Sequence, residues 1–184
     1  MSASGLRGIL DLSLHPMFTG TNFIKEGGAL EANCTGTSTL SGSPKQDCEI
    51  AQYLLCSEFG SDLPAHDYRW WDFVACMYRN QSTLSASDAT EAPFQAVVSS
   101  CSSTAGFAKD KATRLQECYT NDGGALLQKD YEEVTQYYED AVWIVVDGVY
   151  VSDTDAWLTA ICDAYAGTPP AGCAAASTPA ISGR

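Results

Sequence analysis

Eight cysteines constrain this chain more than any other feature of its sequence. Zinc sites usually show close pairs such as Cys-x-x-Cys, whereas the closest cysteines here, Cys48 and Cys56, stand eight positions apart. We therefore expect structural disulfides rather than a metal site, and an oxidising compartment such as the secretory pathway. The expected disulfide cysteines are Cys34, Cys48, Cys56, Cys76, Cys101, Cys118, Cys162 and Cys173.

Two N-glycosylation sequons agree with secretion. They are Asn33-Cys34-Thr35 and Asn80-Gln81-Ser82, so Asn33 and Asn80 are the candidate acceptors. The amino terminus conflicts with this interpretation, because its longest uninterrupted apolar run is Ile9-Leu10 and no signal peptide is recognisable. Either secretion is the wrong interpretation or a segment that precedes Met1 is missing.

Charge and hydropathy exclude several classes of protein. The formal net charge is −13 and no basic cluster exists, so nucleic acid and anionic membranes are not expected partners. No run of 18 apolar residues encodes a transmembrane helix. The apolar share of 45% is ordinary for a folded domain.

The amino-terminal part predicts a strand, a loop and a helix. Residues 9–15 alternate apolar and polar side chains, with three leucines on one face, and Pro16 ends this strand. A long polar loop follows over residues 17–44, and residues 45–59 have helical spacing. On such a helix Cys48 and Cys56 lie about 12 Å apart, beyond the roughly 7 Å that a disulfide spans, so each must pair elsewhere.

Further helices are predicted across the middle of the chain. Residues 68–79 place Trp70, Phe73, Val74 and Met77 on one stripe, which favours a core helix over a binding surface at residues 68–78. Two helices are expected over residues 88–100, capped by Asp88, and 106–119. Asp122-Gly123-Gly124 is expected to break the chain before another helix, which extends to about Tyr138.

The carboxy-terminal part predicts a hairpin and a helix. Two β-branched runs, residues 141–146 and 149–151, are joined through Asp147-Gly148, which is typical of a tight hairpin. Asp153 or Thr154 caps a last helix, whose apolar face is Trp157, Leu158, Ile161, Cys162 and Tyr165. A Gly-Thr-Pro-Pro return then brings Cys173 within reach of Cys162, which is the expected pair. The tail 174–184 is expected to be disordered, and the order of elements suits an α/β or α+β domain.

These motifs resemble the gamma-interferon-inducible lysosomal thiol reductase family, over about residues 9–173. Cys34 stands where the family has Cys-Gln-His-Gly, and Asp47-Cys48 where it has Glu-Cys. The spacing from Cys48 to Cys56 agrees, and Ala51 replaces the family's Asn. Glu117-Cys118, Asp122 and Gly124 match a further family element, and the ending runs Trp-Ile-Val-Val-Asp-Gly, then Leu-Thr-Ala-Ile-Cys-Asp-Ala-Tyr-Ala-Gly, then Cys. All eight cysteines have counterparts among the family's non-catalytic cysteines.

The resemblance implies a thioredoxin-like α/β fold in one disulfide-rich domain, residues 1–173, with a helical insertion at about 45–140. It also implies thiol–disulfide oxidoreductase chemistry on disulfide-containing protein substrates, without a cofactor, in the lysosome or elsewhere along the secretory route. Two departures stand against activity. The chain contains no Cys-x-x-Cys, so the first strand, redox turn and first helix of the family are missing, and Val142 replaces the family's cis-proline. The expected form is therefore truncated or inactive and has no catalytic residue.

Other functions remain open from the sequence. One is a non-catalytic, secreted, disulfide-rich binding module, which Val142 and the lost Gln-His-Gly favour. Another is a hydrolase that uses His15 or His66 with a Ser and an Asp, but no Gly-x-Ser-x-Gly elbow exists, and both histidines are expected at the surface. An acidic run is interpreted as a solvated helix face rather than a calcium site: Asp130, Glu132, Glu133, Glu139 and Asp140. The oligomeric state is not predicted.

Overall fold

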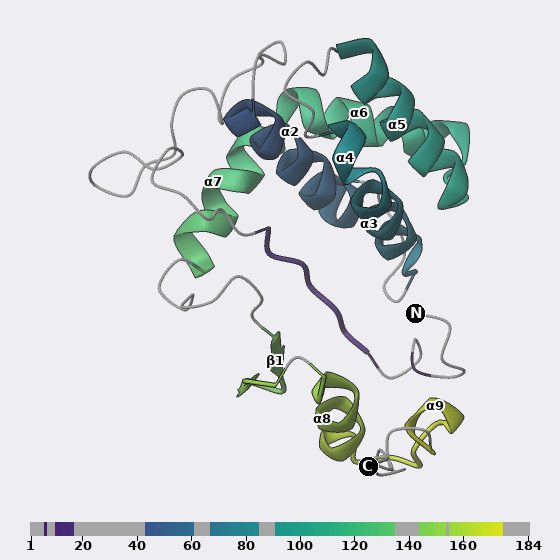
Figure 1. Ribbon diagram of the computed structural model, residues 1–184, viewed down its shortest axis with the longest axis vertical. Coiled ribbons are helices and arrows are strands. Elements are labelled where there is room, and N and C mark those ends of the chain that lie inside the picture. Colours follow the sequence, from purple (N-terminus) through teal and green to yellow (C-terminus); the bar gives the residue numbers. More distant parts are fainter. Residues whose placement is uncertain are drawn as a thin grey trace, which may run out of the picture. The chain divides into compact units, whose positions relative to one another are not determined.

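The computed structural model describes most, but not all, of the chain (Figure 1). The described residues are 6, 10–16, 43–60, 67–84, 91–134, 144–153 and 155–174, with backbone only at 43–47, 131 and 134. The chain divides into two compact units. We call Ser13–Tyr137 the helical unit, and Met1–Leu12 with Tyr138–Arg184 the hairpin unit.

The described part of the helical unit is built almost entirely from helices (Figure 1). Helix α3 packs against α5, and α2 packs against α7. All the helices that the sequence predicts in this unit are present, although their ends are shifted. The predicted ranges were 45–59, 68–79, 88–100, 106–119 and a helix beyond Asp122. Their bounds are α2 Ser43–Leu55, α3 Arg69–Arg79, α4 Gln81–Leu84, α5 Glu91–Thr104, α6 Lys109–Asn121 and α7 Gly123–Val134.

Helix α3 shows why the apolar pattern predicts these helices well. Its stripe of Trp70, Phe73, Val74 and Met77 is buried, as the sequence predicts, and Cys76 is buried beside it. Phe73 is fully buried and stacks on Phe107 with ring centroids 5.8 Å apart. Burying one such aromatic side chain contributes about 1.5–3 kcal/mol, so this stripe fixes the helix within the unit.

A π-helical turn, η2, covers Cys56–Gly60 directly after α2. Such turns are rare and often lie at functional positions. Here the turn approaches α6 so closely that a Cβ atom on Gly60 would lie 2.4 Å from Cys118 Sγ. Only glycine leaves room for that approach, and the turn also directs Glu58 toward its partners in the helical unit.

The predicted strand at residues 9–15 is absent, because residues 10–16 form neither helix nor strand. The expected alternation of burial is nevertheless present: Leu10 is buried and Leu12 and Leu14 are half-buried, whereas the polar residues between them are exposed. A strand is defined by hydrogen bonds to a neighbouring strand, and no strand among the described residues pairs with this segment. The side-chain pattern was therefore correct, but the backbone pairing that it implied was not.

The hairpin unit contains a two-stranded antiparallel sheet and two short helices. Strands β1, Ile144–Val146, and β2, Val149–Val151, pair with Val146 opposite Val149. Asp147 and Gly148 have φ values of 53° and 79°. Two successive positive values are what a type I′ turn requires, so the Asp-Gly signal predicted this hairpin correctly.

Helix α8, Trp157–Ala164, and helix α9, Ala171–Ala174, follow the hairpin. The predicted cap at Asp153 or Thr154 is not the cap of α8, whose N-cap is Ala156. Asp153 instead accepts a hydrogen bond from the Asp155 backbone N–H at 2.9 Å, which forms a turn just before the helix. The tail from residue 175 lies outside the described residues.

The described chain is thus mostly helical with one small sheet. This arrangement contains the expected block of helices, followed by a hairpin and a helix. No helix within the described ranges has the length and apolar character needed to cross a bilayer.

Candidate functional site

Three disulfides crosslink the described helices, and no described cysteine is free. Cys56 in η2 bonds Cys118 in α6, and Cys76 in α3 bonds Cys101 in α5. In the hairpin unit Cys162 of α8 bonds Cys173 of α9, the same pair that the sequence predicts. Cys48 is also disulfide-bonded, and Cys34 lies outside the described residues. Disulfides in this number are typical of secretory and extracellular proteins.

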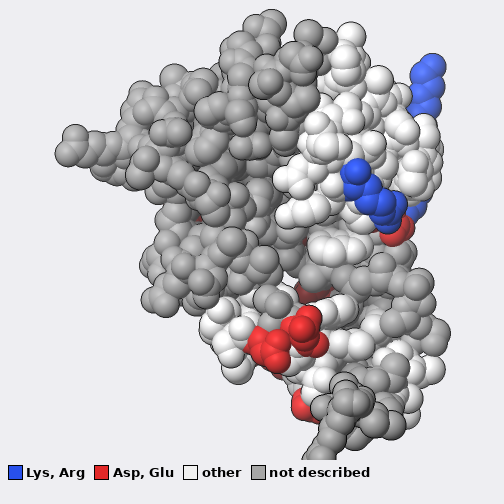
Figure 2. Space-filling view, viewed as in Figure 1, with Lys and Arg blue, Asp and Glu red and all other residues white. Residues whose placement is uncertain are grey.

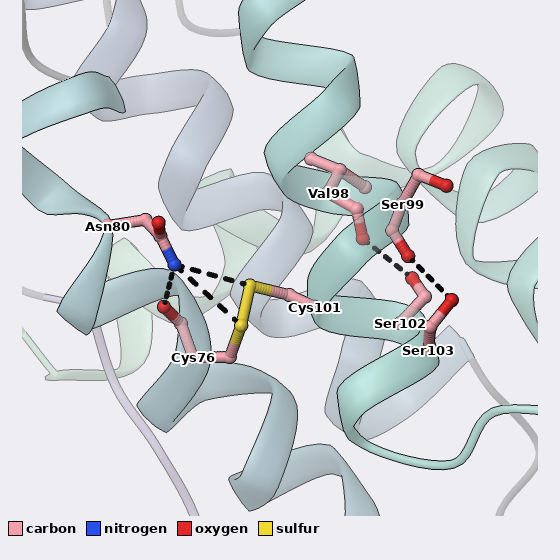
Figure 3. The surroundings of a disulfide bond; sticks show 7 residues. All are labelled: Cys76, Asn80, Val98, Ser99, Cys101, Ser102 and Ser103. Carbon is pink, nitrogen blue, oxygen red and sulfur yellow. Dashed lines mark hydrogen bonds between the residues drawn. A yellow bond between two sulfur atoms is a disulfide. The ribbon is translucent and has the colours of Figure 1, made fainter.

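The disulfide between Cys76 and Cys101 is enclosed by protein (Figure 3). Cys101 is fully buried and Cys76 is 6% exposed. Asn80 Nδ2 donates to the Cys76 carbonyl oxygen at 2.9 Å and lies 3.8 and 3.9 Å from the two sulfurs. Thiol–disulfide exchange needs an attacking thiolate to reach a sulfur atom, so this burial makes the bond a structural crosslink.

Asn80 is also the candidate glycan acceptor, and Nδ2 is the atom to which a glycan would attach. That nitrogen faces the buried disulfide at the end of α3 and bonds the Cys76 carbonyl (Figure 3). A glycan at Asn80 would require this side chain to turn away from the disulfide and give up its bond to the Cys76 carbonyl. Several other residues singled out in the sequence lie outside the described residues: Asn33, His66, Asp88, Glu139, Asp140, Val142 and Thr154.

A cluster of titratable side chains lies where residues 13–16 meet η2 and α7, all within the helical unit. We call Ser13, His15, Glu58 and Asp130 the acid cluster. The His15 Nδ1 atom lies 2.6 Å from Asp130 Oδ1. Glu58 Oε2 accepts a hydrogen bond from the Leu14 backbone N–H at 3.1 Å, and Ser13 also bonds the Glu58 carboxyl group.

Burial changes the acid–base behaviour of this cluster. Desolvation raises the pKa of Glu58 to about 7, although hydrogen bonds from Leu14 and Ser13 and the charge of His15 oppose the rise. The hydrogen bond with Asp130 raises the pKa of His15 above its ordinary value, although partial burial opposes this. The folded chain thus raises the pKa of a carboxyl group and of an imidazole in the same cluster, and shifted pKa values are typical of functional positions.

Two expectations about these residues need correction. Asp130 was assigned to a solvated acidic face, but its side chain is only 7% exposed and contacts His15. A carboxylate is rarely buried this deeply without a partner, and the imidazole is that partner. Glu132 and Glu133 do lie on the exposed face. His15 is exposed, as expected of a surface histidine, but its ring is fixed by Asp130 rather than free in solvent.

Sequence reasoning missed Glu58 altogether and did not connect His15 with Asp130. The two paired residues are 115 positions apart, and Glu58 is 44 positions from Leu14. No spacing rule links residues at such distances. The only hint in the sequence was the histidine directly before Pro16, and it does not indicate which residue the imidazole contacts.

On the described part of the face that Figure 2 displays, acidic and basic side chains form small separate groups among mostly uncharged residues. Among the described residues no group of three or more His, Cys, Asp or Glu side chains is arranged to hold a metal ion. Comparisons with protein families, with curated proteins and with solved structures find no match for this chain.

Proposed function

We propose that this chain is a divergent relative of the gamma-interferon-inducible lysosomal thiol reductases that keeps the crosslinked scaffold without the redox dithiol. The observation that carries the proposal is the pairing of the cysteines. Cys56 with Cys118 and Cys76 with Cys101 join helices of the predicted insertion, and Cys162 with Cys173 ties the last helix. These are positions that the resemblance assigns to non-catalytic cysteines. The hairpin followed by α8 supports the same assignment.

The chemistry of exchange supports a scaffold role for this polypeptide. Disulfide reduction needs a reactive thiolate and a second thiol that resolves the mixed disulfide. The sequence contains no Cys-x-x-Cys, and the described cysteines are consumed in disulfides. Only a longer form of this protein that contains the redox dithiol would then reduce protein disulfides in the lysosome or secretory pathway. The thioredoxin-like arrangement belongs to this same proposal.

A reductase assay with a thiol count tests the proposal. We expect the purified chain to give no alkylated cysteine before chemical reduction, and no acceleration of insulin reduction by dithiothreitol. Turnover that is abolished by prior alkylation would overturn the scaffold role. An accessible free thiol in the natively purified protein would argue against a fully crosslinked framework.

A secreted binding module without catalysis is the second candidate. One observation favours it: Val145 and its cross-strand partner Tyr150 are 50% and 37% exposed on one face of the hairpin, and exposed apolar side chains mark interaction surfaces when they adjoin. The assay on the longest natural product of the gene separates the two candidates. A reductase relative with its dithiol turns over, whereas a binding module does not.

The hydrolase alternative loses support from the acid cluster. His15 and Asp130 are paired through Nδ1, as in hydrolases that orient a histidine base. The Ser13 hydroxyl, however, bonds Glu58, so the nearest serine in sequence is engaged away from that histidine. Ser13 is therefore not placed to serve as the nucleophile for this pair.

A further inference from the structure

The disulfides of the two units differ in how far the protein encloses them. In the hairpin unit Cys173 is buried, but its partner Cys162 is only half-buried. Residues 163–169, which lie between these two cysteines in the chain, are all exposed. The helical unit, in contrast, buries every cysteine of its two described disulfides: Cys56, Cys76, Cys101 and Cys118.

Neighbouring groups cover the sulfur atoms of the helical unit. Asn80 Nδ2 lies 3.8 and 3.9 Å from the sulfurs of Cys76 and Cys101 (Figure 3). At η2 the backbone packs so closely on Cys118 Sγ that no Cβ atom fits on Gly60. Because an attacking thiolate must reach a sulfur atom, exchange at these two bonds requires the helices to separate locally.

We propose that the disulfide between Cys162 and Cys173 is a redox switch, which a small-molecule monothiol of the glutathione type opens while the helical unit stays crosslinked. The thiolate of the small molecule attacks Cys162 Sγ, the bond to Cys173 breaks, and Cys173 leaves as a thiolate. A second small-molecule thiolate attacks the mixed disulfide and releases the Cys162 thiolate. The two released thiolates take up the protons that the attacking thiols lost, so two small-molecule thiols become one disulfide while the protein bond gains two electrons.

The contacts that remain after reduction also differ between the units. In the helical unit α3 packs against α5, and η2 packs against α6, so these cysteines stay close to their partners and favour the oxidised form. Helix α8 places no residue in a core, and α9 buries only Gly172 and Cys173. Little apolar contact therefore holds α9 against α8 once the bond is open, and reduction releases α9.

This switch is independent of the proposed reductase relationship. It concerns the attack of an external thiol on a bond of this chain, and it needs no reactive thiol within the chain. The accessible bond and the enclosed bonds would keep their order of reduction in a binding module as well.

Partial reduction of the intact, natively folded chain measures that order. The chain is incubated with reduced glutathione, the thiols that appear are blocked with iodoacetamide at successive times, and peptide mapping identifies the labelled residues. We expect Cys162 and Cys173 to be labelled at least about ten times faster than the cysteines of the other two described disulfides. Labelling of either of those disulfides at the same rate or earlier would overturn the proposal.

Hydrogen exchange measures whether opening the bond releases α9. In the double variant Cys162→Ser with Cys173→Ser, which cannot form the bond, we expect amides of α8 and α9 to exchange at least about ten times faster than in the parent. Amides of α3 should be unchanged. Thr168→Ser is the matched control, because Thr168 is exposed between the two cysteines, and it should behave as the parent does.

Two results of this measurement contradict the switch. Unchanged exchange in α8 and α9 would mean that other contacts hold α9, and equal acceleration in α3 would mean that opening is not confined to the hairpin unit. If the double variant does not fold, the parent chain after partial reduction with glutathione gives the same comparison.

Discussion

Helices α3 and α8 both carry an apolar stripe, yet α3 places five side chains in the core of the helical unit whereas α8 places none in a core. The hairpin shows the same contrast, because Val145 and Val149 are largely exposed while Phe73 and Phe94 are fully buried. An amphipathic pattern tells which face of an element is apolar, but not what that face packs against. We infer that packing stabilises the helical unit, and that local bonds, including one disulfide, stabilise the hairpin unit.

The largest expected effect is the loss of a core aromatic side chain. Phe73→Ala removes a fully buried ring that stacks on Phe107, and it should lower the free energy of unfolding by about 3–5 kcal/mol. Val149→Ala in the hairpin should cost no more than about 0.5 kcal/mol because its side chain is exposed. Urea unfolding monitored by circular dichroism measures both variants. Equal losses in the two variants would remove the contrast between the units.

We expect the stabilisation that each disulfide provides to increase with the length of chain that it closes. Cys56 and Cys118 are 62 positions apart, and loop-closure entropy assigns this bond about 4 kcal/mol. Cys162 and Cys173 are 11 apart, which gives about 3 kcal/mol. Paired Cys→Ala variants compared by thermal unfolding test the order. A greater loss from the shorter loop would mean that the hairpin unit depends on its crosslink more than chain entropy predicts.

The smallest expected effects distinguish steric crowding from backbone strain at two glycines. Gly60→Ala places a Cβ atom against the Cys118 sulfur and should cost about 1–3 kcal/mol. Gly148→Ala meets no atom within 4 Å, but it forces an L-residue to a φ of 79°, which costs about 1 kcal/mol. Differential scanning calorimetry resolves both shifts. If Gly148→Ala is the more harmful change, turn geometry limits stability more than close packing at η2 does.

The sequence predicted well those helices and turns whose conformation depends on residues close together in the chain. The stripe of α3 and the Asp147-Gly148 turn depend on residues within a few positions of each other, so each was recognisable. The predicted ends of the helices were less accurate. The cap of α8 was misplaced, because Asp153 bonds the backbone of a turn before the helix instead.

Pairings between distant residues were not predictable in the same way. Residues 10–16 have the burial pattern of a strand without a strand partner, and such pairing depends on another part of the chain. The contact between His15 and Asp130 likewise depends on how α7 packs, as does the burial of an acidic residue that resembled a surface charge. The acid cluster is thus a product of tertiary packing.

The bond between Cys56 and Cys118 has a consequence for the lifetime of the protein among proteases. A single cut anywhere between these residues leaves both pieces covalently joined across 62 positions of sequence, and a cut between Cys76 and Cys101 is bridged twice. Nicked molecules would therefore migrate as one species on a gel until a reductant is added. A degradative environment that cuts this part of the chain once must also break sulfur bonds before the two pieces can separate.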